Sequence, residues 1–142
     1  MQYIYLHGFA SGPDSTKARF FAETFQSRGL SLIRPDLNHD FSHLTVTYQL
    51  EQLREITSSF AAQEPITLIG SSMGGWLALL LLRALHNADP KAARRIAGLV
   101  LIAPAADMTA DLMWNIFPPA ARNVLAEKGF YLRPSKYGAP YE

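Results

Sequence analysis

The hydrophobic positions of the chain fall into two kinds of pattern, one typical of buried strands and the other of amphipathic helices. Short apolar runs lie at 2–6, 30–33, 65–69 and 98–103. Apolar residues spaced three and four positions apart lie at 15–28, 46–60 and 73–86. Because strand and helix patterns alternate, right-handed crossovers between parallel strands are favoured. The sequence therefore predicts an α/β fold with a doubly wound, mostly parallel sheet.

The predicted helices differ in how much of their surface is apolar. The segment 73–86 carries Trp76 and many leucines on nearly every side, so it is expected to be buried all round. The segment 46–60 has one apolar face, and Gln49 and Gln52 belong to the opposite, polar face.

Residues 105–142 change in character, since prolines repeatedly interrupt aromatic residues and no strand pattern is present. Two short helices are expected near 109–117 and 119–128, with Pro119 opening the second and Gly129 ending it. A segment of this composition after a strand's carboxyl end is consistent with a lid over an apolar substrate site. Packing residues of an ordinary connection would leave the same pattern.

Composition restricts the protein class. The 142 residues are 49% hydrophobic, enough for one core, so we expect a single domain over 1–142 with a core at 1–104 and the lid-like segment at 105–142. The net charge of +1 and the absence of a charged leader or an apolar stretch of about 18 residues predict a cytoplasmic protein without a membrane span. With no cysteine, disulfides and a thiolate nucleophile are excluded.

The basic residues give no reason to expect a nucleic-acid partner. Lys91, Arg94 and Arg95 form the one basic cluster, and it falls between a predicted helix and a predicted strand. We interpret this cluster as a solvated turn.

A strand, a sharp turn and a helix meet at 70–74, which fits the pattern G-x-S-x-G. Small residues on both sides let the backbone form a strained corner that holds a serine hydroxyl clear of the strand. Only Ser72 fits the register, because Ser71 as nucleophile would put Ile69 and Met73 where the glycines belong. The turn lacks the Gly-Lys-Ser/Thr ending of a phosphate-binding loop. A glycine-rich turn without chemistry is the remaining alternative.

A serine nucleophile needs a base and hydrogen-bond donors for the developing oxyanion. The backbone N–H of Met73 follows the serine directly, and a second donor is expected from the loop after the first strand, where we assign the Phe9 amide. His7 and Gly8 belong to the same loop, and His7 is expected to brace it rather than to transfer protons.

Four stretches together carry a family resemblance. They are Leu6-His7-Gly8-Phe9, Pro35-Asp36, Gly70-Ser71-Ser72-Met73-Gly74-Gly75 and Leu101-Ile102-Ala103-Pro104. In these stretches the chain resembles the α/β-hydrolases, and around 134–137 it resembles the mitochondrial acyl-protein thioesterase branch and its bacterial relatives. The resemblance implies hydrolysis of a small-molecule ester or thioester through an acyl-enzyme at Ser72. It implies that Gly70 and Gly74 shape the turn, and that neither a metal nor a cofactor takes part.

The chain departs from that family in its acid and base. Family members place the acid and then the histidine after the serine, each following a later strand. His86 is about 14 residues further along the same predicted helix, roughly 21 Å by helical rise, and cannot be the base. His39 and His43 precede the serine, and a base there would be an unusual arrangement. Asp107 is either the acid or a cap or first-turn charge of the helix near 109. A C-terminally truncated α/β-hydrolase core is therefore predicted.

A non-catalytic module is the alternative to an esterase. Such a module would bind an acyl or aromatic ligand under the 105–142 segment or dock a second chain. The strand at 98–103 has no later strand beside it, and an open sheet edge favours pairing, so a homo-oligomer is a second expectation.

Overall fold

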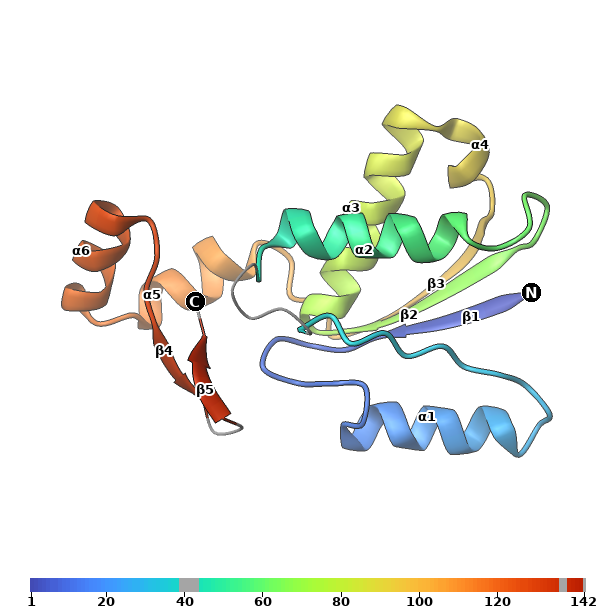
Figure 1. The fold of residues 1–142 in the computed structure, drawn as a ribbon, viewed down its shortest axis with the longest axis horizontal. Helices are drawn as coiled ribbons and strands as arrows, with labels where there is room; N and C mark the ends of the chain where they lie inside the picture. The colour runs from blue at the N-terminus through green and yellow to red at the C-terminus, as the bar shows by residue number, and fades with distance from the viewer. Residues whose placement is uncertain (39–43, 136–137, 142) are drawn as a thin grey trace.

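The sheet of the protein is parallel and has three strands. The structure is a computed structural model that describes residues 1–38, 44–135 and 138–141. Its strands are β1 (Gln2–Leu6), β2 (Ile66–Ser71) and β3 (Ile96–Ile102), in the order β1-β2-β3. Tyr3 pairs with Thr67 and Leu68 with Leu99 (Figure 1). The α/β fold with a parallel sheet is confirmed.

Helices cover both faces of this sheet, which is the doubly wound arrangement. The helices of the core are α1 (Thr16–Gln26), α2 (Val46–Ser58), α3 (Met73–Ala88) and the short α4 (Pro90–Ala93). Helix α1 lies on one side of the sheet, and α2 and α3 lie on the other (Figure 1).

Alternation along the strands explains the two covered faces. Ile4 and Leu6 of β1 belong to the hydrophobic cluster with α2 and α3, where Leu53 and Leu77 are fully buried. Tyr5 points the other way and packs in a smaller cluster with Ala18 of α1. Successive side chains of a strand point to opposite faces, so one strand supplies both cores.

The expected strand at 30–33 is wrong. Only one parallel bridge joins Ile33 to Ile4, in which the Ile33 N–H donates to the Tyr3 carbonyl at 2.9 Å and its carbonyl accepts from Tyr5 at 2.8 Å. Pro35 has no N–H to continue the ladder, which limits this run to a single bridge.

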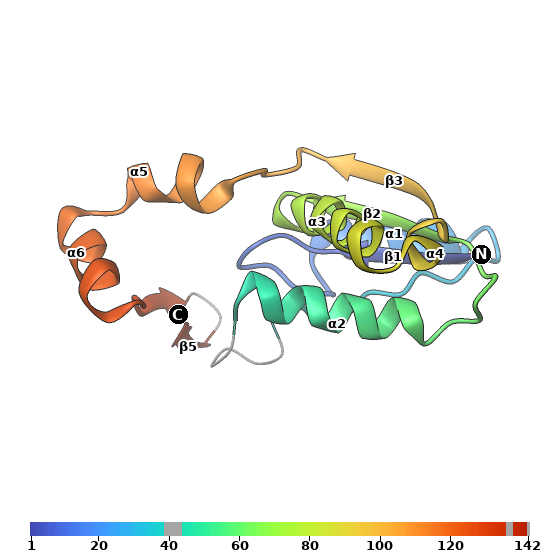
Figure 2. The same ribbon diagram turned by 90° about the horizontal axis from the view of Figure 1, so that it is seen from above.

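The segment after β3 reaches beyond the carboxyl ends of the strands (Figure 2). It consists of a π-helical turn (Met108–Met113), α5 (Trp114–Ile116), α6 (Pro119–Lys128), β4 (Arg133–Ser135) and β5 (Gly138–Tyr141). The bounds of α6 agree with the expectation, and Gly129 ends it at φ 78°, in the left-handed region that glycine favours. The expectation of no strand here is wrong, because β4 and β5 pair antiparallel.

Helix α3 is not buried on every side, contrary to expectation. Leu79 on α3 is exposed, as are Val100 and Leu101 on β3. Within the described residues β3 pairs only with β2, so this flank of the sheet has no cover there. No helix in the described ranges is long and apolar enough to cross a bilayer.

The basic cluster is only partly the solvated turn that we expected. Lys91 and Arg94 are exposed. Arg95 is half-buried and donates to the Phe60 carbonyl at 3.2 Å and to the Glu64 carbonyl at 3.4 Å. Arg95 thus fixes the end of α2 and the approach to β2.

Candidate active site

Ser72 stands at the corner between β2 and α3 in a strained backbone conformation. Its φ of 54° and ψ of −121° lie where few residues with a side chain are found. The surrounding chain holds this corner in place. The Ser72 N–H donates to the Ile102 carbonyl at 2.9 Å, and the Ser72 carbonyl accepts from Gly75 at 2.9 Å and from Ala105 at 3.1 Å. Strain of this kind persists at functional sites when neighbours over-determine it.

The glycines on either side of Ser72 have no room for a side chain. A Cβ at Gly74 would overlap the backbone of Leu6 and His7, and a Cβ at Gly70 would overlap the backbone of Gly74. These contacts bring the start of α3 against the end of β1. Glycine at both positions is therefore a steric requirement of the turn.

The loop after β1 lies directly against the serine. A Cβ built on Gly8 would lie 3.3 Å from the Ser72 Cβ and 3.8 Å from its Oγ. Phe9 follows Gly8, and Met73 is the first residue of α3, whose first amides have no acceptor within the helix. The structure thus brings Ser72, Met73 and the Gly8–Phe9 loop together.

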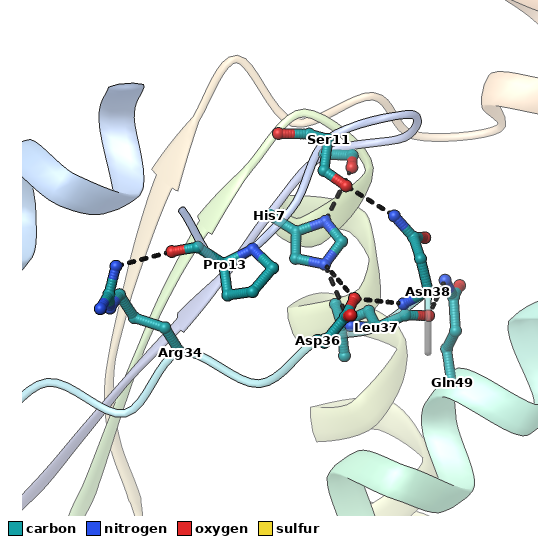
Figure 3. A network of polar contacts seen from close by, with 9 residues as sticks. His7, Ser11, Pro13, Arg34, Asp36, Leu37, Asn38 and Gln49 are labelled. Carbon is teal, nitrogen blue, oxygen red and sulfur yellow. Dashed lines mark hydrogen bonds and ion pairs between the residues drawn. The ribbon is translucent and has the colours of Figure 1, made fainter. Parts of the chain in front are cut away.

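His7 is fully buried and both of its ring nitrogens are engaged (Figure 3). Nε2 accepts from the Leu37 N–H at 3.0 Å, and Nδ1 lies 2.9 Å from the Gly8 carbonyl. An acceptor at Nε2 and a donor at Nδ1 together describe a neutral imidazole with its proton on Nδ1. This geometry supports a bracing role, since backbone groups engage both ring nitrogens.

Further hydrogen bonds tie the loop after β1 to residues 36–38 (Figure 3). Asn38 Nδ2 donates to the Ser11 carbonyl at 2.6 Å, and its backbone N–H donates to Asp36 Oδ1 at 2.9 Å. Gln49 of α2 donates to the Leu37 carbonyl at 3.0 Å. Sequence reasoning missed Asn38, and it placed the buried Gln49 on a polar face. Helical spacing could not show that Gln49 is buried, because a buried glutamine and a solvated one give the same polar position in the sequence pattern.

Phe9, next to the Ser72 corner, borders two cavities of different chemistry. An apolar cavity of about 420 Å³ lies between the core and the segment after β3. Its lining includes Phe9, Val46, Met73, Met108, Trp114, Phe117 and Phe130. A second cavity of about 320 Å³ contains Ser72 itself and is lined mainly by hydroxyl-bearing residues. Phe9 borders both cavities.

Comparison with known proteins places this architecture in a family. Residues 2–112 match the model of an uncharacterised protein family, UPF0227. The chain belongs to UPF0227. The resemblance to the α/β-hydrolases is confirmed by relatives of known structure. A candidate hydrolase from Agrobacterium vitis S4 superposes with a TM-score of 0.75 at 30% identity, covering 98% of this chain and 55% of the other.

Two further relatives are named as an α/β-hydrolase domain protein and as a thioesterase. Alpha/beta hydrolase domain-containing protein 10 from mouse superposes with a TM-score of 0.66 at 28% identity, covering 96% of this chain and 53% of the mouse chain. The mitochondrial palmitoyl-protein thioesterase ABHD10 of Bos taurus is 29% identical over 140 residues, which is 94% of this chain and 43% of the bovine protein. The UPF0227 chain thus spans about half the length of these relatives. Because the bovine protein is mitochondrial, the cytoplasmic location stays a prediction.

Two of the other candidate groups of the UPF0227 chain, His86 and Asp107, fall within the described residues. His86 lies in the last turn of α3, at the end opposite Met73. Asp107 is exposed at a φ of 50° and stands at the N-cap position of the π-helical turn, where its side chain makes no capping hydrogen bond. Its role as the acid or as a charge at this helix start stays a prediction. His39 and His43 lie outside the described residues. In the described ranges no group of three or more metal-binding side chains is found.

Proposed function

We propose that this chain carries the nucleophilic part of a serine hydrolase that cleaves carboxylic esters or thioesters through an acyl-enzyme at Ser72. The observation that supports this most is the strained backbone of Ser72 between two obligatory glycines. A turn without chemistry would have no reason to keep a serine at φ 54°, where glycine avoids the strain. The thioesterase name of the bovine relative supports the reaction class.

The reaction begins with attack by Ser72 Oγ on the acyl carbon as a base removes the hydroxyl proton. The carbonyl oxygen becomes an oxyanion, for which we propose the backbone N–H groups of Met73 and Phe9 as donors. The bond from the acyl carbon to the leaving sulfur or oxygen then breaks, and the thiol or alcohol departs with a proton. Water attacks the acyl-enzyme, releases the acid and restores Ser72.

His7 has a positioning role in this proposal. Its hydrogen bonds to Gly8 and Leu37 connect the Phe9 loop to residues 36–38 from within the core. The second connection, from Asn38 to Ser11, holds the far end of the same loop. A preorganised donor stabilises the oxyanion without moving during the reaction, so a rigid loop serves catalysis directly.

The apolar cavity is the proposed site of the acyl group. Phe9 and Met73 line it beside the proposed oxyanion donors, and Trp114, Phe117 and Phe130 close it from the segment after β3. This placement supports the interpretation of residues 105–142 as a lid. The chemical identity of the acyl group is not fixed by a cavity lined almost wholly by apolar side chains.

The described residues supply no base, so we propose that this chain is an incomplete enzyme. Loss of a triad base lowers turnover by about four to six powers of ten, while oxyanion donors and binding alone retain roughly 10³ to 10⁴ over water. Residues 1–142 should therefore hydrolyse a short activated ester far more slowly than about 1 per second. Faster turnover that Ser72→Ala eliminates would show that a base is present after all.

Labelling with a fluorophosphonate tests the identity of the nucleophile. The reagent should modify Ser72 slowly but selectively, and Ser72→Ala should abolish the modification. Ser71→Ala is the matched control, because it removes the neighbouring hydroxyl and should leave labelling intact. Labelling that persists in Ser72→Ala would remove Ser72 from the mechanism.

A non-catalytic docking module remains a second candidate because the edge of β3 is exposed. Val100 is 46% exposed and Leu101 is 36% exposed on a strand that pairs on one side only in the described sheet. Unpaired, apolar edges favour association with another strand. Sedimentation velocity should show concentration-dependent dimers for this candidate, and a strict monomer at high concentration would contradict it.

A further inference from the structure

The cavity that contains Ser72 differs in chemistry from the apolar one beside it. Hydroxyl groups reach it from β1, from the loop after β1, from the start of α1 and from β2. The residues that supply them are Tyr5, Ser11, Ser15, Thr16, Ser71 and Ser72. A cavity with this lining offers many hydrogen-bond donors and little apolar surface. It is therefore suited to a polar group and poorly suited to an acyl chain.

Tyr5 contributes a protonated hydroxyl to the lining of this cavity at neutral pH. Burial raises the pKa of Tyr5, and hydrogen bonding to the Ser71 and Ser15 side chains partly offsets this rise. The phenol therefore stays protonated well above neutral pH. Tyr5 is 2% exposed and belongs to the lining of the cavity.

Among the described residues, the charged one that lines the cavity is Lys17 of α1. Within the described part of the chain Lys17 forms no ion pair. The nearest carboxylate in sequence, Asp14, is instead paired with Arg34 at 3.2 Å. The charge of Lys17 is thus available to a ligand in the cavity.

We infer that the polar cavity binds the leaving group of the substrate, and that it selects a leaving group bearing a negative charge. This inference rests on the proposed function, because it divides one substrate between two cavities that both border Phe9. The acyl chain takes the apolar side, and the thiol or alcohol portion takes the side with Lys17 and the hydroxyls. Lys17 is then a residue that determines specificity and takes no part in bond breaking.

Two esters with one acyl group and different leaving-group charge test the inference. The pair is 3-carboxy-4-nitrophenyl butyrate, which is anionic, and its methyl ester, which is neutral. The rate of Ser72 acylation by residues 1–142 is measured by mass spectrometry under single-turnover conditions. Each rate is divided by that ester's spontaneous hydrolysis, which removes the difference in intrinsic reactivity.

The anionic ester should acylate Ser72 about fivefold faster than the neutral one, the size expected for an exposed charge pair. Lys17→Gln should bring the ratio to about one, and so should 1 M salt, at which charges are screened beyond roughly 3 Å. Lys91→Gln is the matched control, because Lys91 is an exposed lysine of α4 that does not line the cavity, and it should leave the ratio unchanged.

Equal rates for the two esters, or a preference that survives Lys17→Gln, would overturn the inference while leaving Ser72 as the nucleophile. Failure of both esters to acylate Ser72 would instead contradict the proposed function. In that case the affinities of the two esters test the inference without acylation. Ligand-observed NMR with Ser72→Ala should still show about fivefold tighter binding of the anionic ester that Lys17→Gln removes, and equal affinities would overturn it.

Discussion

Replacement of Ser72 by glycine tests whether the backbone at this position is strained, through a change in the free energy of unfolding. Ser72 occupies φ 54° and ψ −121°, which costs a residue with a side chain about 1–3 kcal/mol. Glycine adopts this conformation freely. It also loses more chain entropy on folding, which offsets roughly 0.5–1 kcal/mol of the stability gained. The Ser72 side chain makes no capping hydrogen bond to α3, so little else is lost. Ser72→Gly should therefore stabilise the fold by about 1 kcal/mol, the middle of a range of roughly 0–2.5 kcal/mol.

Thermal unfolding followed by circular dichroism measures this difference, with an expected rise in midpoint of about 2–8 °C. Ser71→Gly is the matched control. Ser71 is the last residue of β2, is 5% exposed and has no positive φ, so glycine there should destabilise the fold by about 1 kcal/mol or more. If Ser72→Gly destabilised the protein as much as Ser71→Gly, the backbone at Ser72 would not be strained and the argument would fail.

Three further changes follow from the same geometry. Gly74→Ala should lower the free energy of unfolding by about 3 kcal/mol or more, because its Cβ overlaps the Leu6 backbone, whereas Gly12→Ala, with open space around it, should have little effect in the same urea titration. His7→Ala leaves the buried Leu37 N–H without an acceptor, so it should cost about 1–3 kcal/mol and slow fluorophosphonate labelling; unchanged labelling would contradict its positioning role. For Tyr5, burial raises the folded-state pKa above 10.0, so stability should be full below pH 10 and fall as pH rises further. Tyr5→Phe should remove that part of the alkaline loss in unfolding measurements, and an identical pH profile would contradict it.

Much of the core could be predicted from the sequence because its strands and helices carry regular periods. The bounds of β1 and the start of α2 coincide with the apolar patterns at 2–6 and 46–60. The Ser72 turn could be located because it needs glycine on both sides. In the structure a Cβ at Gly70 or Gly74 would overlap backbone atoms. Sequence patterns were sufficient where the size of a single side chain determines the backbone conformation.

Predictions failed where partners distant in the sequence decide the structure. The run at 30–33 has strand composition, yet its pairing reduces to one bridge, because pairing depends on the partner strand and on Pro35. Gln49 and Arg95 were expected to face solvent, but each caps backbone carbonyls of another segment. The hairpin of β4 and β5 carries two prolines and no alternation, so neither strand had a signal in the sequence.

The candidate site was predictable only in part for the same reason. The sequence pointed to Ser72, Met73 and the loop at 7–9, since each follows a strand end. It gave no sign that Lys17 and Ser15 line a cavity with Ser72, because they belong to the start of α1, more than 50 residues earlier in the chain.

Acid-quenched mass spectrometry after incubation with an aryl thioester tests the central claim most directly. The protein and its Ser72→Ala variant are digested, and the acylated peptide is identified in each. The account predicts one acyl group, attached to Ser72, that accumulates over hours because no base hastens its removal, and no acylated peptide in Ser72→Ala. An acyl group on another residue, or equal acylation of the two proteins, would contradict the assignment of Ser72 as the nucleophile.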